Sequence, residues 1–214
     1  MDDESVVREA ISGSREAFDE LVRKHRGQIY TLIRTVIGDD SDADDLTQEC
    51  FVRAYVAIVR FREESSFRTW LTRIAVNVAR TYLARRRRGR QPVSLEVASD
   101  GERWMSDSFV VDSDIEAAFC RRRAIVRALV QLPEECRVAL TLRDVQGFEY
   151  HEIAEILNTP IGTIEARVFR ARRRLRPLLR QWLQRSPAAP GAGSESDDRH
   201  DLQRRVRLNR THHR

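Results

Sequence analysis

Apolar side chains recur every three to four residues along almost the whole of this 214-residue sequence, and no run alternates apolar and polar residues as a β-strand would. The stretch that begins near Ser14 places Phe18, Leu21 and Ile29 on one side and ends at the turn that starts with Gly38. A residue in a helix faces the same side as those three and four positions away, so this spacing predicts helices. The sequence therefore predicts an all-α fold.

The helical spacing disappears twice, once within the chain and once near its end. Prolines, glycines, serines and acidic residues replace it after position 90, and it is lost again beyond position 185. We therefore expect two small helical domains joined by a flexible linker. The predicted ranges are 5–89 for the first domain, 90–113 for the acidic linker, 114–185 for the second domain and 186–214 for a disordered tail.

The charge and the cysteines limit the classes of protein that the chain can belong to. The formal net charge is +5, and arginine supplies nearly all of the positive charge, which favours a polyanionic partner. No apolar run is long enough to span a membrane and the N-terminus is acidic, so a cytoplasmic location is expected. Cys50, Cys120 and Cys136 are too far apart for a CxxC pair and are expected to be buried apolar residues.

The segment 150–175 carries the sharpest local pattern. A short amphipathic helix with Ile153 and Ile156 is followed by a turn that contains Pro160 and Gly162, and then by a second amphipathic helix that Thr163 is predicted to cap. This order is typical of a helix-turn-helix that places its second helix in the major groove of DNA. On that helix Glu165 has two interpretations, because an acid in the first turn stabilises the helix dipole and also accepts a hydrogen bond from cytosine.

A second polar helical face follows Ser65 and Ser66, either of which is suited to cap a helix. Arg73, Asn77 and Arg80 recur on one side of the predicted helix, opposite an apolar side. Side chains of this kind suit contact with nucleic acid.

The aromatic residues Phe61, Phe67 and Trp70 beside this helix have two interpretations. They are suited to stack on unpaired bases, or they belong to the hydrophobic core.

The predicted helix over about residues 42–59 carries a third polar stripe. Asp45, Gln48, Glu49 and Val52 line up away from its apolar face, which Tyr55 is expected to join. The stripe suits docking to a protein, although a solvated helix with an acidic first turn would look the same. The neighbouring aspartates lack the glycine and the closing glutamate of a calcium-binding loop, so no metal or other cofactor is expected.

These segments together resemble extracytoplasmic-function sigma factors of bacterial RNA polymerase, which belong to the sigma-70 family. The resemblance to the second conserved region of that family rests on DADDLTQECF at 42–51, SFRTWL at 66–71 and IAVN at 74–77. The resemblance to the fourth region rests on LPEE at 132–135, YHEIA at 150–154, GTI at 162–164 and the arginines that follow. Two unrelated sets of motifs in the family's order are far more specific than a single helix-turn-helix.

The resemblance implies a role for each group of residues. Binding of the core polymerase is implied for Asp45, Gln48, Glu49 and Val52. Binding of the opened minus-ten element is implied for Phe61, Arg62, Ser65, Ser66, Trp70, Arg73, Asn77 and Arg80. Binding of the minus-thirty-five element is implied for Arg143, Thr163, Glu165, Ala166, Arg167, Phe169, Arg170 and Arg173. Family members commonly carry a basic residue and a serine in place of Glu165 and Ala166, so the promoter sequence does not carry over.

The resemblance also implies partners. The first is core RNA polymerase, which the chain would contact at the clamp helices and the flap. The others are promoter DNA and an anti-sigma factor that holds the free protein inactive. The acidic linker would mimic nucleic acid inside the polymerase, and the regulon would concern stress or the envelope.

Two other functions compete with this interpretation. A regulator that binds operators without polymerase would need a sensor or receiver module, and none is visible in the sequence. An enzyme is not expected, because no metal-binding HExxH, glycine-rich phosphate loop or plausible nucleophile pair is present.

Overall fold

The computed structural model describes residues 3–89 and 124–185, whose regular secondary structure is helical and which contain no strand. The first part comprises α1 (Asp3–Ile11), α2 (Arg15–Ile37), α3 (Ala43–Ala57), the short 3₁₀ helix η1 (Ile58–Arg60) and α4 (Phe67–Gly89). The second comprises a helix over 124–130, α6 (Glu134–Leu140), the π-helical η2 (Thr141–Val145), α7 (Tyr150–Leu157) and α8 (Ile161–Arg185). The predicted all-α class is confirmed. The expected linker (90–113) and tail (186–214) lie outside the described residues.

The bounds of α2 follow from local capping, as the sequence predicts. Ser14 is the N-cap and its hydroxyl accepts a hydrogen bond from the backbone N–H of Ala17 at 3.2 Å. Gly38 ends the helix in the left-handed conformation at φ 73°, where its N–H donates to the carbonyl of Arg34. The separate helix α1 was not anticipated. It ends at Ile11, and Gly13, with a φ of 99°, turns the chain before Ser14.

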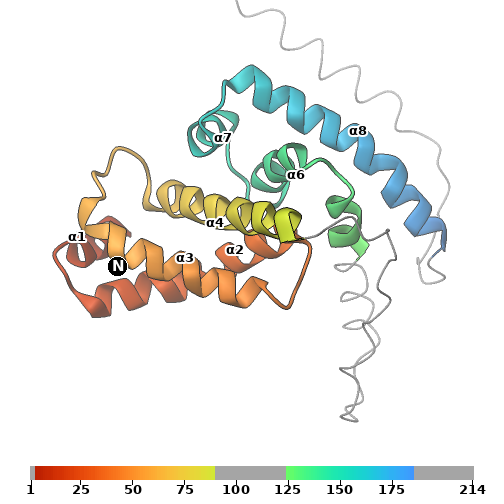
Figure 1. Cartoon of the computed structure of the whole chain (residues 1–214). Coiled ribbons are helices and arrows are strands. Elements are labelled where there is room, and N and C mark those ends of the chain that lie inside the picture. Colours follow the sequence, from red (N-terminus) through yellow and green to blue (C-terminus); the bar gives the residue numbers. More distant parts are fainter. Residues whose placement is uncertain (1–2, 90–123, 186–214) are drawn as a thin grey trace, which may run out of the picture. The chain divides into compact units, whose positions relative to one another are not determined.

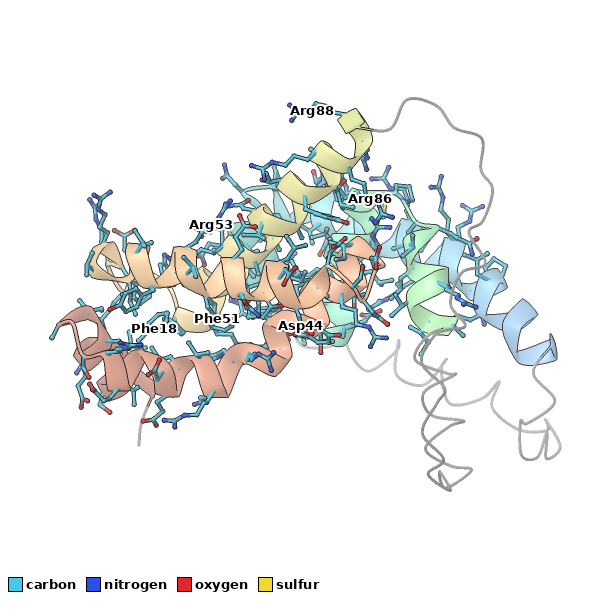
Figure 2. The ribbon with its side chains drawn as sticks, turned by 60° about the horizontal axis from the view of Figure 1, so that its bottom comes forward. Phe18, Asp44, Phe51, Arg53, Arg86 and Arg88 are labelled. Carbon is cyan, nitrogen blue, oxygen red and sulfur yellow. The ribbon has the colours of Figure 1, made fainter. Side chains whose placement is uncertain are left out.

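Helices α2, α3 and α4 pack around one core in the N-terminal part of the chain. Figure 2 shows Phe18 and Phe51 between α2 and α3, and both side chains are buried. Small residues let α4 approach closely, since Ala75 and Ala79 are completely buried. Cys50 is also completely buried, which raises the pKa of its thiol to about 12. Cys136 is 7% exposed, so the predicted burial is confirmed for Cys50 and Cys136. Cys120 lies outside the described residues.

The buried residues of the C-terminal part come mainly from α6, η2, α7 and α8. Phe148, Ile153 and Ile164 are completely buried, and Val168 is buried one turn after Ile164. At the start of α7, Glu149 and Glu152 form a reciprocal capping box.

The turn of the predicted helix-turn-helix is present, but its second helix begins earlier than expected. Asn158 ends α7 in the left-handed conformation at φ 46°, and α8 then starts at Ile161. The N–H of Ile164 donates to the carbonyl of Pro160, so Pro160 occupies the capping position. The prediction that Thr163 caps α8 is therefore wrong. A proline just before the first turn is tolerated because its missing N–H would have no partner within the helix.

No helix among residues 3–89 and 124–185 is long and apolar enough to cross a membrane.

Candidate functional surfaces

The polar face of α4 carries the residues that the sequence singles out. The side chain of Ser66 accepts a hydrogen bond from the N–H of Thr69 at 3.1 Å and caps the helix, as predicted. Asn77 is exposed in the middle of the helix, and Arg73 and Arg80 lie half-buried about one turn to either side. The amide of Asn77 thus lies between two guanidinium groups on one surface.

The aromatic residues beside α4 form a cluster at the edge of the core. The ring centroids of Phe61 and Trp70 are 5.1 Å apart, and those of Phe67 and Trp70 are 5.6 Å apart. Phe67 is buried, which favours the core interpretation for this residue, whereas Phe61 and Trp70 are half-buried. The loop that leads to them carries Arg62 and Ser65, of which Arg62 is exposed.

The acidic turn before α3 is a network of internal ion pairs rather than an open cluster. Arg34 binds Asp40, and Arg26 lies 3.0 Å from Asp44. The hydroxyl of Tyr82 in α4 donates a hydrogen bond to Asp42. This part of the acidic turn therefore ties α2, α3 and α4 together.

Asp39 belongs to the same network through Arg86, which is 3.3 Å away and is seen near this turn in Figure 2. Partial burial raises the pKa of Asp39, but hydrogen bonds from Ser41 and the charge of Arg86 outweigh it and leave the pKa below its ordinary value. Asp45 is exposed and, unlike these aspartates, has no polar partner among the described residues.

The predicted stripe on α3 is exposed, and it continues beyond Val52, where the sequence interpretation ended it. Asp45 and Gln48 are exposed, Glu49 pairs with Arg53 of the same helix, and Val52 is 64% exposed. Beyond Val52 the stripe continues through three more exposed residues, which are Tyr55, Val56 and Val59.

Tyr55 was expected on the buried face, and that assignment is wrong. Its side chain is 50% exposed, with only its ring edge against Phe18 at 5.0 Å between centroids. Val52, Val56 and Val59 follow a spacing of four and three residues, so the helical pattern that indicates a core face also fits this outer face. Together these residues form an exposed surface that is acidic at its start and apolar at its end.

The outer face of α8 is exposed as predicted. Its exposed residues include Glu165, Ala166, Phe169, Arg170 and Arg173. Phe169 is 68% exposed, which is unusual for a large apolar side chain in a well-packed helix.

Two other predicted residues of α8 lie closer to the protein. Thr163 is half-buried in the first turn, and the side chain of Arg167 is only 14% exposed. Arg167 contacts Glu135 of α6 at 2.7 Å. In this arrangement Arg167 holds α8 against α6.

Arg143 lies in η2 beside the start of α7. Its guanidinium donates to the carbonyl of Phe148 at 2.9 Å, contacts Glu149 at 2.9 Å and lies 4.9 Å from the ring centroid of Tyr150. The hydrogen bond to Glu149 is the main reason that the pKa of Arg143 lies above its ordinary value. These contacts fix the side chain next to the helix-turn-helix.

The neighbouring residue Asp144 binds α8, which the sequence interpretation missed. Arg172 donates to both carboxylate oxygens of Asp144, at 3.1 and 2.6 Å. The two residues are 28 positions apart, so no local pattern indicated this pair. Among residues 3–89 and 124–185, no group of three or more potential metal ligands is placed to hold a metal ion.

Comparisons with known proteins show the family to which the chain belongs. Residues 21–89 match the family model for sigma-70 region 2, and residues 122–175 match the model for sigma-70 region 4. The chain is 40% identical over 188 residues to the RNA polymerase sigma-H factor of Pseudomonas aeruginosa, which covers 84% of this chain and 96% of that protein. It is 35% identical over 188 residues to the ECF RNA polymerase sigma-E factor of Escherichia coli, which covers 84% of this chain and 97% of that protein.

A solved sigma factor has a similar fold. The sigma factor RpoE of Bartonella quintana, in a co-crystal with the anti-sigma factor NepR, superimposes with a TM-score of 0.56 at 25% identity, covering 76% of this chain and 96% of that one. Sequence identity of 35–40% across more than four fifths of the chain, with both family regions in order, shows that the protein belongs to the extracytoplasmic-function group of the sigma-70 family.

Proposed function

We propose that this chain binds core RNA polymerase, directs it to a set of promoters and helps to open the DNA there. The observation that supports this most directly is the pair of polar faces on α4 and α8, each within its own sigma-70 family region. The chain would act by binding energy alone, and the polymerase would carry out the chemistry.

The face of α4 would hold the opened minus-ten element. Arg73 and Arg80 would neutralise phosphates, and the exposed amide of Asn77 would hydrogen-bond to an unpaired base. The preceding loop and the aromatic cluster would bracket flipped bases through Phe61, Arg62, Ser65, Ser66 and Trp70. The half-buried state of Phe61 and Trp70 supports this, because packing holds part of each side chain while the rest is accessible.

The face of α8 would enter the major groove at the minus-thirty-five element. Arg170 and Arg173 are exposed on that face and would contact phosphates or guanine, while Phe169 suits contact with a thymine methyl group. Glu165, Ala166 and Thr163 lie in the first two turns, where recognition helices contact base edges. Arg143 and Arg167 would support the interface from beside α8.

The stripe on α3 would dock on the clamp helices of the polymerase. Asp45, Gln48 and Glu49 supply polar contacts, and Val52 with Tyr55, Val56 and Val59 supplies apolar area. A polar edge beside an apolar centre is typical of protein interfaces. The apolar end would supply most of the binding energy.

The remaining partners follow from the relatives. Because the Bartonella quintana protein was solved with an anti-sigma factor, we infer that an anti-sigma factor also restrains this chain. The chain would work in the cytoplasm and serve a stress or envelope regulon.

Run-off transcription with purified core polymerase tests the proposal. The template is the promoter upstream of the chain's own gene, and the readout is a transcript that needs both the chain and the polymerase. If the chain binds that DNA tightly by itself and does not bind polymerase, the operator-binding regulator is correct instead.

A further inference from the structure

We propose that Glu165 sets the base preference of the outer face of α8, because its carboxylate accepts a hydrogen bond from the amino group of a cytosine in the minus-thirty-five element. The inference rests on the proposed function and names the base that this face reads. Figure 1 shows α8 directly after α7 and the short turn that joins them. Glu165 is exposed, and it is the only acidic residue in a helix whose other charged residues are arginines.

The helix dipole does not account for this acid. If Thr163 were the cap, Glu165 would lie in the first turn, where an acid stabilises the dipole. Instead α8 begins at Ile161, and its first turn contains no acidic residue. Glu165 therefore lies in the second turn, and the effect of the dipole falls off within the first. The early start of α8 argues against the first of the two interpretations that the sequence allows for Glu165.

An ion pair along α8 does not account for it either. Residues three and four positions away are the neighbours of a side chain on a helix surface. For Glu165 none of these neighbours is charged, and they are Ile161, Gly162, Val168 and Phe169. A helix that carries many arginines thus places none of them where it would pair with its one carboxylate.

The arginines closest to Glu165 in the sequence have other partners. Arg167 contacts Glu135 of α6 at 2.7 Å, and the Nε of Arg170 donates to the carbonyl of Ala166 at 3.2 Å. Glu165 itself makes no hydrogen bond or ion pair within residues 3–89 and 124–185. A carboxylate without a partner is repelled by the phosphates of any DNA that this face meets. Only a base that donates a hydrogen bond to it offsets that repulsion.

The surroundings of Glu165 leave room for the edge of a base pair. Gly162 lies one turn earlier, and a side chain at that position would point into open space. Ala166, the next residue, is small and exposed. The backbone of the first two turns is therefore able to approach the floor of a groove closely, which brings the carboxylate within reach of a base.

Cytosine is the base whose major-groove edge suits a carboxylate. Its N4 amino group is a donor, whereas guanine and thymine present acceptors there, and adenine places its N7 acceptor beside its N6 amino group. An ionised carboxylate is only an acceptor, so guanine and thymine repel it. Repulsion of the wrong bases contributes to specificity together with attraction of the right one.

Phe169 indicates where a second base lies. It is one turn further along the same stripe and is 68% exposed. Four residues advance a helix by about 6 Å, which is roughly two base-pair steps. The thymine proposed for Phe169 should therefore lie within about two base pairs of the cytosine read by Glu165.

Selection of bound DNA tests the proposal. The library is the promoter upstream of the chain's own gene with its minus-thirty-five element randomised, and the protein is the full chain assembled with core polymerase. The parent should prefer cytosine at one position by about fivefold or more. Glu165→Gln should change the preferred base there to adenine, because a glutamine amide pairs with its N6 and N7. Glu165→Ala should abolish the preference at that position and leave the other positions unchanged.

Glu20→Gln is the matched control. It removes one exposed carboxylate from α2, so it changes the net charge as Glu165→Gln does, and it should alter the preference at no position. Circular dichroism of each variant shows whether it is folded, which an exposed position such as Glu165 should permit.

Two results would overturn the assignment. One is a folded Glu165→Ala variant that keeps the base preferences of the parent at every position, even if it binds all sequences more tightly. The other is a position that responds to Glu165→Ala but at which the parent prefers a base other than cytosine.

The inference and the proposed function fail in different assays. If transcription depends on the chain but the Glu165 variants keep the parent's preferences, only the inference is wrong. If the chain directs no transcription with core polymerase, the proposed function is wrong, and the same selection with the chain alone decides the role of Glu165. A chain that selects no DNA in either form would overturn both.

Discussion

Arg172 in α8 binds both carboxylate oxygens of Asp144 in η2, at 3.1 and 2.6 Å, and so links the proposed recognition helix to the segment that carries Arg143. The hydrogen bond that Arg172 donates to Asp144 is the main reason that the pKa of Arg172 lies above its ordinary value. The pair is bidentate, which fixes direction as well as distance. It also withholds one arginine of α8 from any other anion.

Replacing Asp144 with Asn should release Arg172. Because both side chains are about half exposed, the expected loss of stability is small, about 1 kcal/mol or less. DNA affinity of the free chain should rise, with a steeper dependence on salt, because one more arginine becomes available for phosphate. Thermal melting and binding at several salt concentrations check both effects. An unchanged salt dependence would show that Arg172 does not reach DNA.

Replacing Arg170 with Ala should weaken promoter binding by the holoenzyme. The residue is exposed on the outer face of α8, and loss of one phosphate contact should reduce the slope of log affinity against log salt by about 1. Arg180→Ala, further along the same helix, is the matched control. If Arg170→Ala leaves both affinity and slope as they were, Arg170 does not contact DNA.

Replacing Asn77 with Ala should impair opening of the promoter more than its initial binding. The amide is exposed and is proposed to contact an unpaired base, which exists only after melting. Permanganate reactivity of unpaired thymines measures opening, and a gel-shift assay under conditions that keep the duplex closed measures binding. Equal losses in the two assays would contradict this role.

Replacing Val56 with Glu should weaken binding to core polymerase at least tenfold without unfolding the chain. The side chain is 71% exposed, so the folded chain tolerates a charge there, whereas burial of that charge in an interface is costly. Ile125→Glu places the same charge on another exposed apolar residue, outside α3. Competition with a labelled sigma factor for core polymerase compares the two variants, and equal binding would exclude Val56 from the interface.

Asp39 should make stability depend on pH. Its pKa is lower in the folded chain than the ordinary value of 3.8, so its contribution is complete above that value and is lost as the pH falls through the folded-state pKa. Asp39→Asn should therefore lower the melting temperature at neutral pH. The difference from the parent chain should shrink as the pH falls below about 4. A difference that stays constant with pH would mean that the charge of Asp39 contributes nothing.

Local patterns determined much of this protein from the sequence alone. The all-α class, the caps at Ser14 and Ser66 and the left-handed end of α2 at Gly38 follow from residues a few positions apart. The exposed face of α8 was predictable for the same reason, because a helix repeats its direction every 3.6 residues. The start of α8 was predicted wrongly, because Pro160 and not Thr163 occupies the capping position.

Only the tertiary structure decided which distant side chains meet. Helical periodicity gives two faces to α3 but does not say how much of each the neighbours cover, and so Tyr55 was placed on the wrong side. The contacts of Glu134 with Arg87 and of Glu155 with Arg73 join residues 47 and 82 positions apart. Such pairs depend on how whole helices pack, and packing distance is set by the shapes of buried side chains rather than by any local spacing.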